Sequence, residues 1–251
     1  MKAVILAAGY ATRLYPLTEN KPKCLLEVAH ITILDRLVEE LNAITSLEKI
    51  VLVTNARFFE QLNMWKKTSH SRVPVQIIND RTTSNDNRLG AIGDLGLAVR
   101  EAGIKTDLLL LASDNLFEQS LASFVDFAQG KKESVAIAVY DLGKPELASK
   151  KFGVIETSAT DEVIGFEEKP EKPKSSLIGM GVYYFPGKTL PLIAEYLSQK
   201  NAQDAPGFYV AWLLGKVKIF CLRFKGLWFD IGDIRSLEEA NQIFKSKKIK
   251  G

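Results

Sequence analysis

Cysteine and long apolar segments are both scarce in this chain of 251 residues. It has two cysteines, Cys24 and Cys221, which stand in apolar stretches without the spacing of a metal site. We therefore expect reduced, packed thiols in a cytoplasmic protein. The first apolar run is too short for a signal peptide, and no run reaches the length of a transmembrane helix. We expect no membrane partner.

A large excess of one charge is also missing. The 33 basic and 30 acidic residues leave a formal net charge of +3 at pH 7, and no basic stripe of the kind that binds nucleic acid is evident. We expect no nucleic-acid partner and interpret the basic residues 243–251 as a solvated helix end. No hexapeptide repeat is present, so a β-helix tail is not expected.

What remains has the composition of an ordinary globular protein, with 46% hydrophobic and 25% charged residues. In the first half, short apolar runs alternate with segments that carry apolar residues at helical spacing. The predicted strands are 3–6, 49–54, 75–78 and 107–112, and the predicted helices are 33–41, 57–65 and 94–102. This order predicts a Rossmann-like α/β fold, with a mixed, mainly parallel sheet and helices on both faces.

The second half contains more strands and fewer helices. The predicted strands are 134–140, 153–157, 162–167, 178–185, 217–223 and 227–229, the predicted helices are 190–199 and 236–244, and 201–209 is a predicted loop. No linker rich in proline, glycine or serine is present. We expect one domain over residues 1–251, with two halves at about 1–115 and about 116–251.

The segment LAAGYATRLYPLTENKPKCLL, residues 6–26, has the features of a phosphate-binding loop. Small residues such as Gly9 let backbone N–H groups approach an anion closely. Arg13 and Lys23 add positive charge beside those groups. The segment is neither a Walker loop nor a dinucleotide fingerprint, and a purely structural turn is the alternative. The balance favours binding of a triphosphate.

Asp114 follows the leucine-rich strand at 107–112, and Asp230 follows the strand at 227–229. A carboxylate at the tip of a buried strand in an α/β sheet can ligate a metal or a phosphate-bound metal, so Asp114 is a candidate metal ligand. The alternative for Asp114 is an Asx-turn that closes the strand. From the sequence alone, Asp230 is predicted to be a turn residue. Asp233 is expected as the N-cap of the last helix.

A third motif, Glu168-Lys169-Pro170, stands at the end of the predicted hairpin. Glu168 suits the hydroxyl groups of a bound acceptor, and Lys169 suits its phosphate. Pro170 ends the strand because it cannot donate to a sheet. From the sequence alone, the alternative is a solvated hairpin edge with mixed charges.

Together these motifs resemble those of the sugar-1-phosphate nucleotidyltransferases, such as glucose-1-phosphate thymidylyltransferases. The family signature L-A-A-G-x-G-T-R-L-x-P-x-T, followed by P-K-x-L, matches from Leu6 onward, with Ala11 in place of the second glycine. The added methyl of Ala11 is expected to tighten the loop without abolishing it. The family's G-D-N motif matches at Asp114, where Ser113 replaces the glycine. Its E-E-K-P and W-x-D-x-G motifs match at the third motif and at Asp230.

The resemblance implies an enzyme that converts an NTP, with dTTP or UTP expected, and a sugar 1-phosphate into an NDP-sugar and pyrophosphate. It implies catalytic roles for Arg13, Lys23 and Lys169, and Mg²⁺ held by Asp114 and Asp230. The implied nucleotide-binding residues, in the first half, are Leu6, Ala8, Gly9, Ala11, Thr12, Arg13, Lys23, Asn85, Arg88 and Gly90. The implied sugar-phosphate-binding residues, in the second half, are Gly153, Glu168, Lys169 and Tyr183.

The resemblance is weakest where the family binds the nucleobase. Asn85, Asn87 and Arg88 could hydrogen-bond a base edge, and Gly90 could let the base lie on the backbone. The alternative is a polar loop followed by a helix start, with Gly93–Asp94 as the cap. The sequence therefore leaves the base open.

Two other functions are compatible with the same motifs. One is a nucleotidyltransferase for a non-sugar acceptor, such as phosphocholine with CTP. The other is an inactive nucleotide-binding regulator on the same fold, although both acids are retained. The sequence also allows a homo-oligomer.

Overall fold

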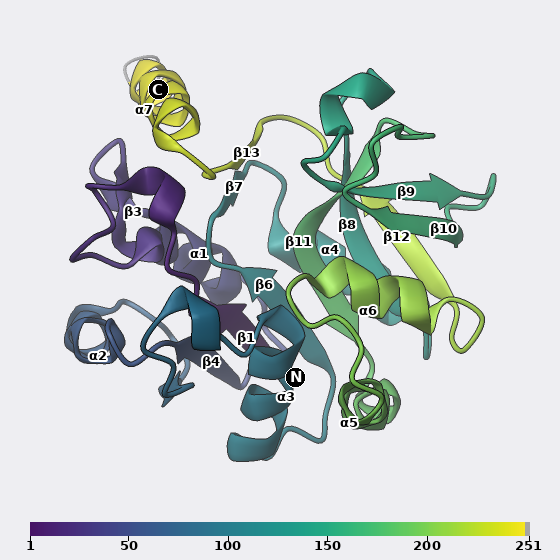
Figure 1. Cartoon of the computed structure of the whole chain (residues 1–251), viewed down its shortest axis with the longest axis horizontal. Helices are drawn as coiled ribbons and strands as arrows, with labels where there is room; N and C mark the ends of the chain where they lie inside the picture. The colour runs from purple at the N-terminus through teal and green to yellow at the C-terminus, as the bar shows by residue number, and fades with distance from the viewer. Residues whose placement is uncertain (249–251) are drawn as a thin grey trace.

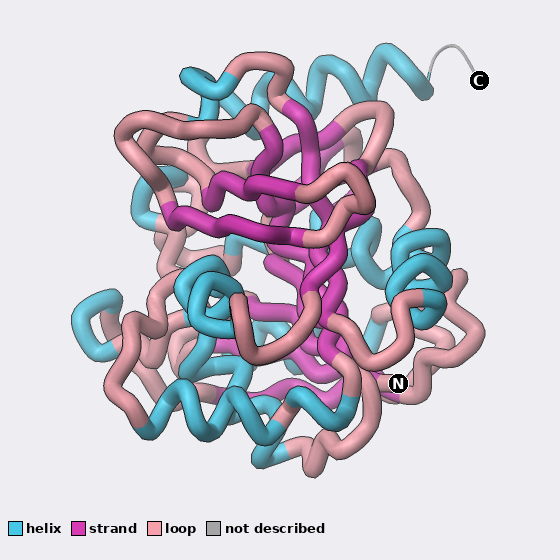
Figure 2. The backbone as a smooth tube through the Cα atoms, turned by 90° about the vertical axis from the view of Figure 1, so that its right-hand side faces the viewer, coloured by secondary structure: helices cyan, strands magenta, loops and turns pink. Residues whose placement is uncertain are grey.

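The computed structural model describes residues 1–248, and its centre is a mixed sheet of nine strands (Figures 1 and 2). Four of the strands are parallel and lie in the order β6-β1-β4-β5. Their bounds are Lys2–Leu6 (β1), Lys49–Thr54 (β4), Val75–Asn79 (β5) and Leu108–Ala112 (β6). Because these strands are parallel, their carboxyl ends lie at one edge of the sheet.

The sheet continues through β11 (Leu177–Phe185), which pairs antiparallel with β6 and also contacts β8 and β9. The other strands of this part are β8 (Val135–Asp141), β9 (Gly153–Thr157), β10 (Val163–Glu168) and β12 (Ile219–Arg223). Strand β11 therefore joins the two halves in one sheet. Outside it lie the short strands β2 (Glu27–Val28), β3 (Ile31–Thr32), β7 (Asn115–Phe117) and β13 (Trp228–Asp230).

Helices lie on both sides of the strands (Figure 2). One apolar cluster contains side chains of α1, α2 and α4, and a second contains side chains of α3, α5 and α6. Their bounds are Ile33–Asn42 (α1), Phe59–Thr68 (α2), Ala91–Glu101 (α3), Leu121–Gly130 (α4), Pro191–Ser198 (α5) and Pro206–Leu213 (α6). The predicted α/β fold, with a mixed sheet and helices on both faces, is confirmed.

Helix α7 (Ile234–Lys248) packs apart from the main sheet. A third apolar cluster joins Leu237 and Ala240 of α7 to Leu14 in the loop after β1 and to Ile231 after β13. The last three residues of the basic segment 243–251 lie outside the described residues. Short 3₁₀ helices occur at Thr12–Leu14, Lys23–Leu25, Asn85–Asn87, Pro145–Ala148 and Gly187–Thr189.

Some predicted boundaries were wrong. Helix α3 begins at Ala91 and its N-cap is Gly90, so Gly93–Asp94 is not the cap. The predicted loop at 201–209 ends where α6 begins, at Pro206. The sequence of α6, PGFYVAWL, is apolar on nearly every side, so it lacks the amphipathic pattern that identifies a surface helix. None of the helices in residues 1–248 combines the length and apolar character needed to cross a membrane.

The central strands should dominate the stability of this fold. Leu109 in β6 has no exposed surface, whereas the side chain of Met64 in α2 is largely exposed. We expect Leu109→Ala to lower the free energy of unfolding by about 2–5 kcal/mol, because it removes buried apolar contacts and leaves a cavity. Met64→Ala should change it by less than about 0.5 kcal/mol. Urea unfolding of the two variants tests this, and equal effects would contradict the packing described.

Candidate active site

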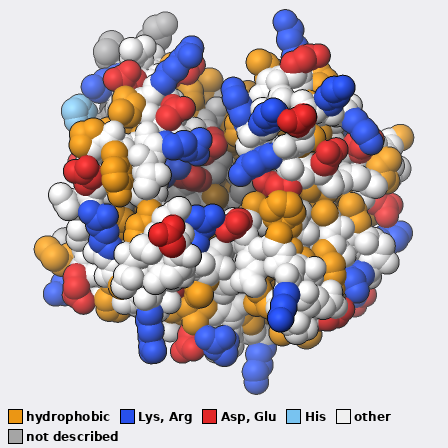
Figure 3. Space-filling view, viewed as in Figure 1, with side chains coloured by type: hydrophobic (Ala, Val, Ile, Leu, Met, Phe, Trp, Pro, Cys, Tyr) orange, Lys and Arg blue, Asp and Glu red, His pale blue; other side chains and the backbone are white. Residues whose placement is uncertain are grey.

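The carboxyl edge of the parallel strands borders a cavity of about 470 Å³. The loop after β1 forms one wall, and Asp114, just after β6, lies in another. A second cavity of about 250 Å³ adjoins it, and Arg13, Asp114 and Lys169 line both. Figure 3 shows the molecule hollowed between its halves, with basic side chains at the rim.

Buried polar side chains fix the backbone of the candidate phosphate loop. The side chain of Asn55, after β4, donates a hydrogen bond of 2.9 Å to the carbonyl of Ala8. The hydroxyl of Thr18 donates one of 2.8 Å to the carbonyl of Ala11. Both side chains are fully buried. The loop is therefore held in one shape before any ligand binds.

Ala11 itself has φ 48° and ψ 42°, in the left-handed region. An L-residue pays about 1–2 kcal/mol for this conformation, and glycine does not. A glycine at this position, as in the family motif, would adopt the same conformation without that cost. The alanine therefore has a backbone effect in addition to the added methyl expected from the sequence.

The two candidate metal ligands are brought together by a pair of short strands. Strands β7 and β13 are antiparallel, and Asp230 is paired with Asn115, the residue after Asp114. The N–H of Ile231 also donates a 2.9 Å hydrogen bond to the carbonyl of Asp114. Both acids line the smaller cavity. Residues from distant parts of the chain therefore meet beside the phosphate loop.

Asp114 is held at both carboxylate oxygens. The ammonium of Lys23 lies 2.7 Å from Oδ2, and the side-chain amide of Asn115 donates a 2.9 Å hydrogen bond to Oδ1. Asn115 in turn accepts a 2.7 Å hydrogen bond from the indole N–H of Trp228. Lys23 is mostly buried and does not line either cavity, so its first contact is with Asp114.

The environment disfavours the charged form of Asp230. Burial and the neighbouring charge of Asp114 raise its pKa to about 6, while Lys23 and Arg13 act in the opposite direction. Nearby basic groups therefore do not fully compensate the acid pair. A divalent cation would supply the missing positive charge.

The donor set suits Mg²⁺ only if the substrate completes it. Within residues 1–248, no group of three or more His, Cys, Asp or Glu side chains could hold a metal ion. Asp114 and Asp230 offer carboxylate oxygens, which Mg²⁺ prefers, and it commonly takes one or two carboxylates plus phosphates and water. The pair therefore fits a metal that arrives with a polyphosphate.

The smaller cavity contains the predicted acceptor residues Gly153, Glu168, Lys169 and Tyr183. The carboxylate of Glu168 lies against the backbone of Gly153 and Gly207, where a Cβ would overlap the ring of Phe166. This explains the glycine at 153 by its protein neighbours. Burial raises the pKa of Glu168, although Lys169, with Nζ 3.8 Å from Oε1, lowers it.

Lys169 and Tyr183 differ in accessibility. The side chain of Lys169 is about half exposed (55%), on a residue with φ 50°. Non-glycine residues in this region are strained and concentrate at functional sites. Tyr183 is buried, and burial followed by the charge of Glu168 raises its pKa. It is mainly a packing residue at the wall of the site.

Asn85, Arg88 and Gly90, the expected base-binding residues, also line the cavity of about 470 Å³. Gly90 has φ 79°, and a Cβ there would lie 2.6 Å from the carbonyl oxygen of Gln203. The guanidinium of Arg88 is paired with Asp204, at 3.1 Å. Segments 85–90 and 203–204 therefore form one rim of the cavity.

The structure gathers the predicted residues around these two cavities, except Lys23, which lines neither. Those in the wall of the larger one are Leu6, Ala8, Gly9, Ala11, Thr12, Arg13, Asn85, Arg88, Gly90, Asp114, Lys169 and Tyr183. Asn55 and Asp94 were missed, and Asn115, the last residue of the motif at Asp114, was given no role. Nothing local in the sequence marks Asn55 or Asp94 as part of the site.

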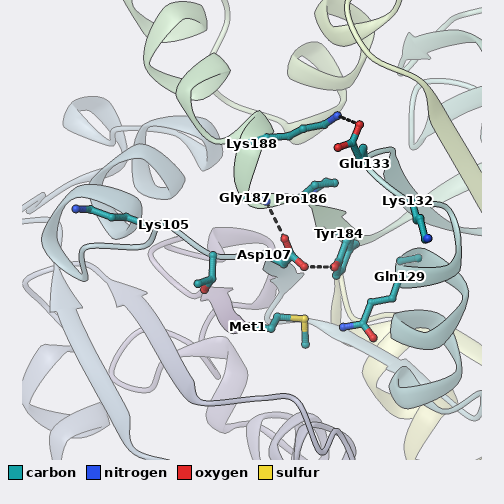
Figure 4. Close-up of a pocket in the computed structure, with 12 residues that line it drawn as sticks. Met1, Lys105, Asp107, Gln129, Lys132, Glu133, Tyr184, Pro186, Gly187 and Lys188 are labelled. Atoms are coloured by element: carbon teal, nitrogen blue, oxygen red, sulfur yellow. Dashed lines mark hydrogen bonds and ion pairs between the residues drawn. The ribbon is translucent and has the colours of Figure 1, made fainter.

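A third cavity, of about 620 Å³, lies at the opposite end of β6 and is shown in Figure 4. The carboxylate of Asp107 in its wall accepts hydrogen bonds from the Tyr184 hydroxyl (2.5 Å) and the Gly187 N–H (2.8 Å). Lys188 in its wall is paired with Glu133. The acid and this lysine are satisfied by protein groups, and none of the motifs lies there.

Known proteins resemble this chain in sequence and in fold. The nucleotidyl transferase family profile matches residues 2–247. The bifunctional protein GlmU of Methanocaldococcus jannaschii is 28% identical over 98% of this chain and 55% of its own length. That of Methanococcus aeolicus is 30% identical over 100% of this chain and 57% of its own. The chain thus spans a little over half the length of these relatives.

Solved structures share the fold. A provisional glucose-1-phosphate thymidylyltransferase from Bacillus anthracis superposes with a TM-score of 0.80, 23% identity and coverage of 97% of this chain and 94% of that one. A UDP-glucose pyrophosphorylase without ligand gives a TM-score of 0.82, 19% identity and coverage of 98% of both chains. From the extent of the profile match, this chain belongs to the nucleotidyl transferase family.

Proposed function

We propose that this chain transfers a nucleotidyl group from an NTP to a sugar 1-phosphate, giving an NDP-sugar and pyrophosphate. The observation that carries the proposal is the acid pair, Asp114 and Asp230, beside two adjoining cavities. One cavity has the phosphate loop in its wall, and the other has Glu168 and Lys169. A reaction that joins two phosphates requires both substrates to meet at such a boundary.

The proposed NTP is dTTP or UTP. Support comes from the descriptions of two proteins with the same fold, a thymidylyltransferase and a UDP-glucose pyrophosphorylase. The proposed acceptor is a sugar because Glu168 is nearly buried and has spare acceptor oxygens for hydroxyl groups.

In the proposed mechanism, a phosphate oxygen of the sugar 1-phosphate attacks the α-phosphorus in line, and pyrophosphate leaves. The nucleophile is already anionic, so no strong general base is needed, and catalysis rests on alignment and charge neutralisation. Arg13 steadies the leaving pyrophosphate, and Lys169 orients the attacking phosphate. Lys23, which lines neither cavity, acts through its ion pair with Asp114 and not by direct contact with the α-phosphate.

The proposed metal ligands are Asp114 and Asp230. Lys23 and Asn115 orient the carboxylate of Asp114, and the β7–β13 pairing fixes Asp230 next to it. Bound Mg²⁺ would neutralise charge that develops on the phosphate oxygens.

A second candidate acceptor is phosphocholine, with CTP as donor. Phe152 and Trp228 line the smaller cavity, with ring centroids 5.4 Å apart. Aromatic faces attract quaternary ammonium groups. Trp228 also packs on Tyr140 and binds Asn115, which gives it a structural role in either case.

We further propose that residues 1–251 act as one catalytic domain in the cytoplasm. The continuous sheet through β11 supports a single domain. Both cysteines are free and buried, which supports a reducing compartment. We also propose that the chain forms a homo-oligomer.

The direct test is pyrophosphate release from UTP, dTTP, CTP, ATP or GTP with sugar 1-phosphates or phosphocholine, in the presence of Mg²⁺. We expect turnover with UTP or dTTP and a sugar 1-phosphate. Asp114→Asn should lower kcat by on the order of a hundred- to a thousand-fold, because charge stabilisation at the reacting phosphates is lost.

Asp126→Asn, an exposed acid on α4, is the matched control and should leave kcat unchanged. Circular dichroism checks that both variants fold. Release only with CTP and phosphocholine would favour the second candidate. No release with any pair would leave the inactive regulator as the better description.

Lys169→Ala separates the two halves of the site. We expect the KM for the sugar 1-phosphate to rise by about 10- to 100-fold, because a charge-assisted contact to its phosphate is lost. The KM for the NTP should change by less than about 3-fold. Lys172→Ala, an exposed neighbour, is the control. An effect confined to the NTP would reverse the assignment of the cavities.

A further inference from the structure

Asp94 is a buried acid in the wall of the larger cavity for which the proposed mechanism has no use. It lies in the first turn of α3, directly above Gly90, to whose carbonyl its N–H donates a 2.9 Å hydrogen bond. Only 6% of its surface is exposed, yet it lines the cavity with Asn85, Arg88 and Gly90. Burying an acid costs free energy unless its charge is compensated or removed.

No positive partner compensates Asp94. Its Oδ1 is fully buried and has no hydrogen-bond donor among the described residues. The neighbouring side chain is another buried acid, Asp80, whose oxygens accept hydrogen bonds from the N–H (2.7 Å) and hydroxyl (2.8 and 3.0 Å) of Thr82. Two buried carboxyl groups joined by a hydrogen bond are stable when they share one proton.

The donors on Asp80 decide which acid keeps the proton. Burial raises the pKa of Asp80, and the donors from Thr82 oppose that shift. Asp94 has no such donors, and burial, the charge of Asp80 and the hydrogen bond with it raise the pKa of Asp94 to about 8. The other charged groups in the cavity wall are Arg13, Arg88, Asp114, Lys169 and Asp204. Arg88 is paired with Asp204, and Asp80 is the one charge that shifts Asp94. Burial beside Asp80 therefore favours the neutral form of Asp94.

A neutral Asp94 can donate its O–H in a hydrogen bond to Asp80. Its other oxygen is then an uncharged hydrogen-bond acceptor that faces the cavity. The N3–H of uracil or thymine is a donor flanked by two carbonyl oxygens. A charged carboxylate would repel those oxygens, and a neutral one would not. Guanine has the opposite pattern, since its adjacent N1–H and N2–H₂ donors favour a charged carboxylate.

Resting on the proposed function, we infer that Asp94 selects the nucleobase. One carboxyl oxygen of Asp94 shares a proton with Asp80, and the other accepts a hydrogen bond from N3–H of a uracil or thymine base. This makes Asp94 a specificity-determining residue that favours UTP or dTTP over GTP.

The test is the pH dependence of the KM for UTP in pyrophosphate release, from pH 7 to pH 9. In the unmodified protein, ionisation of Asp94 should raise this KM by about 10-fold across the range. Asp94→Ala should raise it by about 10-fold already at pH 7. Asp94→Asn can donate to Asp80 and keep an acceptor oxygen. It should therefore recover most of the lost affinity, with a KM that changes by less than about 2-fold with pH.

Two further measurements make the outcome unambiguous. The ratio of kcat/KM for UTP to that for GTP should fall from pH 7 to pH 9 in the unmodified protein and stay constant in Asp94→Asn. Asp86→Asn, an exposed acid nearby, should keep the unmodified pH profile. Thermal melting shows whether each variant is folded. A folded Asp94→Ala with unchanged KM, or the same pH profile in Asp94→Asn as in the unmodified protein, would overturn the inference. Absence of pyrophosphate release from every NTP would instead overturn the proposed function.

Discussion

The short antiparallel pairing of β7 with β13 brings acids from distant parts of the chain to one point. It has three residue pairs, and it is reinforced by the backbone bond from Ile231 to Asp114 and by the indole bond from Trp228 to Asn115. Ile231 belongs to the apolar cluster that docks α7. Burial of that cluster therefore stabilises the position of Asp230 as well as the helix. Because the acids repel each other, nearby Lys23 is needed to hold the arrangement without metal.

Several residues of the site are in conformations or environments that lower the stability of the free protein. Ala11 and Lys169 have left-handed backbone angles, Asp230 is buried beside Asp114, and Asp94 is buried beside Asp80. Each is unfavourable for the free protein. Such features persist where the surrounding structure fixes them, and ligands that bring a cation, an anion or a hydrogen-bond donor can relieve them. The phosphate loop shows the principle, since buried Asn55 and Thr18 hold its carbonyls in place.

Much of the fold could be predicted because buried parallel strands are short aliphatic runs. The predicted bounds of β4 and β9 agree with the structure. Helix α4 also carries a readable signal, with Leu121, Phe124, Val125 and Ala128 on one face, but it was not predicted. In contrast, α6 lacks an amphipathic pattern, and the N-cap of α3 depends on Gly90 fitting against Gln203 from a distant segment. Such contacts leave no local trace. The motifs identified Asp114 and Asp230 as candidates but gave Asn115 no role. Asn55 and the Asp80–Asp94 pair were missed because only distant contacts bring them to the site.

The central claim is that Asp114 and Asp230 share one divalent cation with a bound polyphosphate. The most direct measurement is anomalous X-ray scattering from crystals grown with Mn²⁺ and UTP. The account predicts an anomalous peak in contact with both carboxylates and with a phosphate oxygen. Bound nucleotide with its Mn²⁺ in contact with neither carboxylate, or with only one of them, would contradict it.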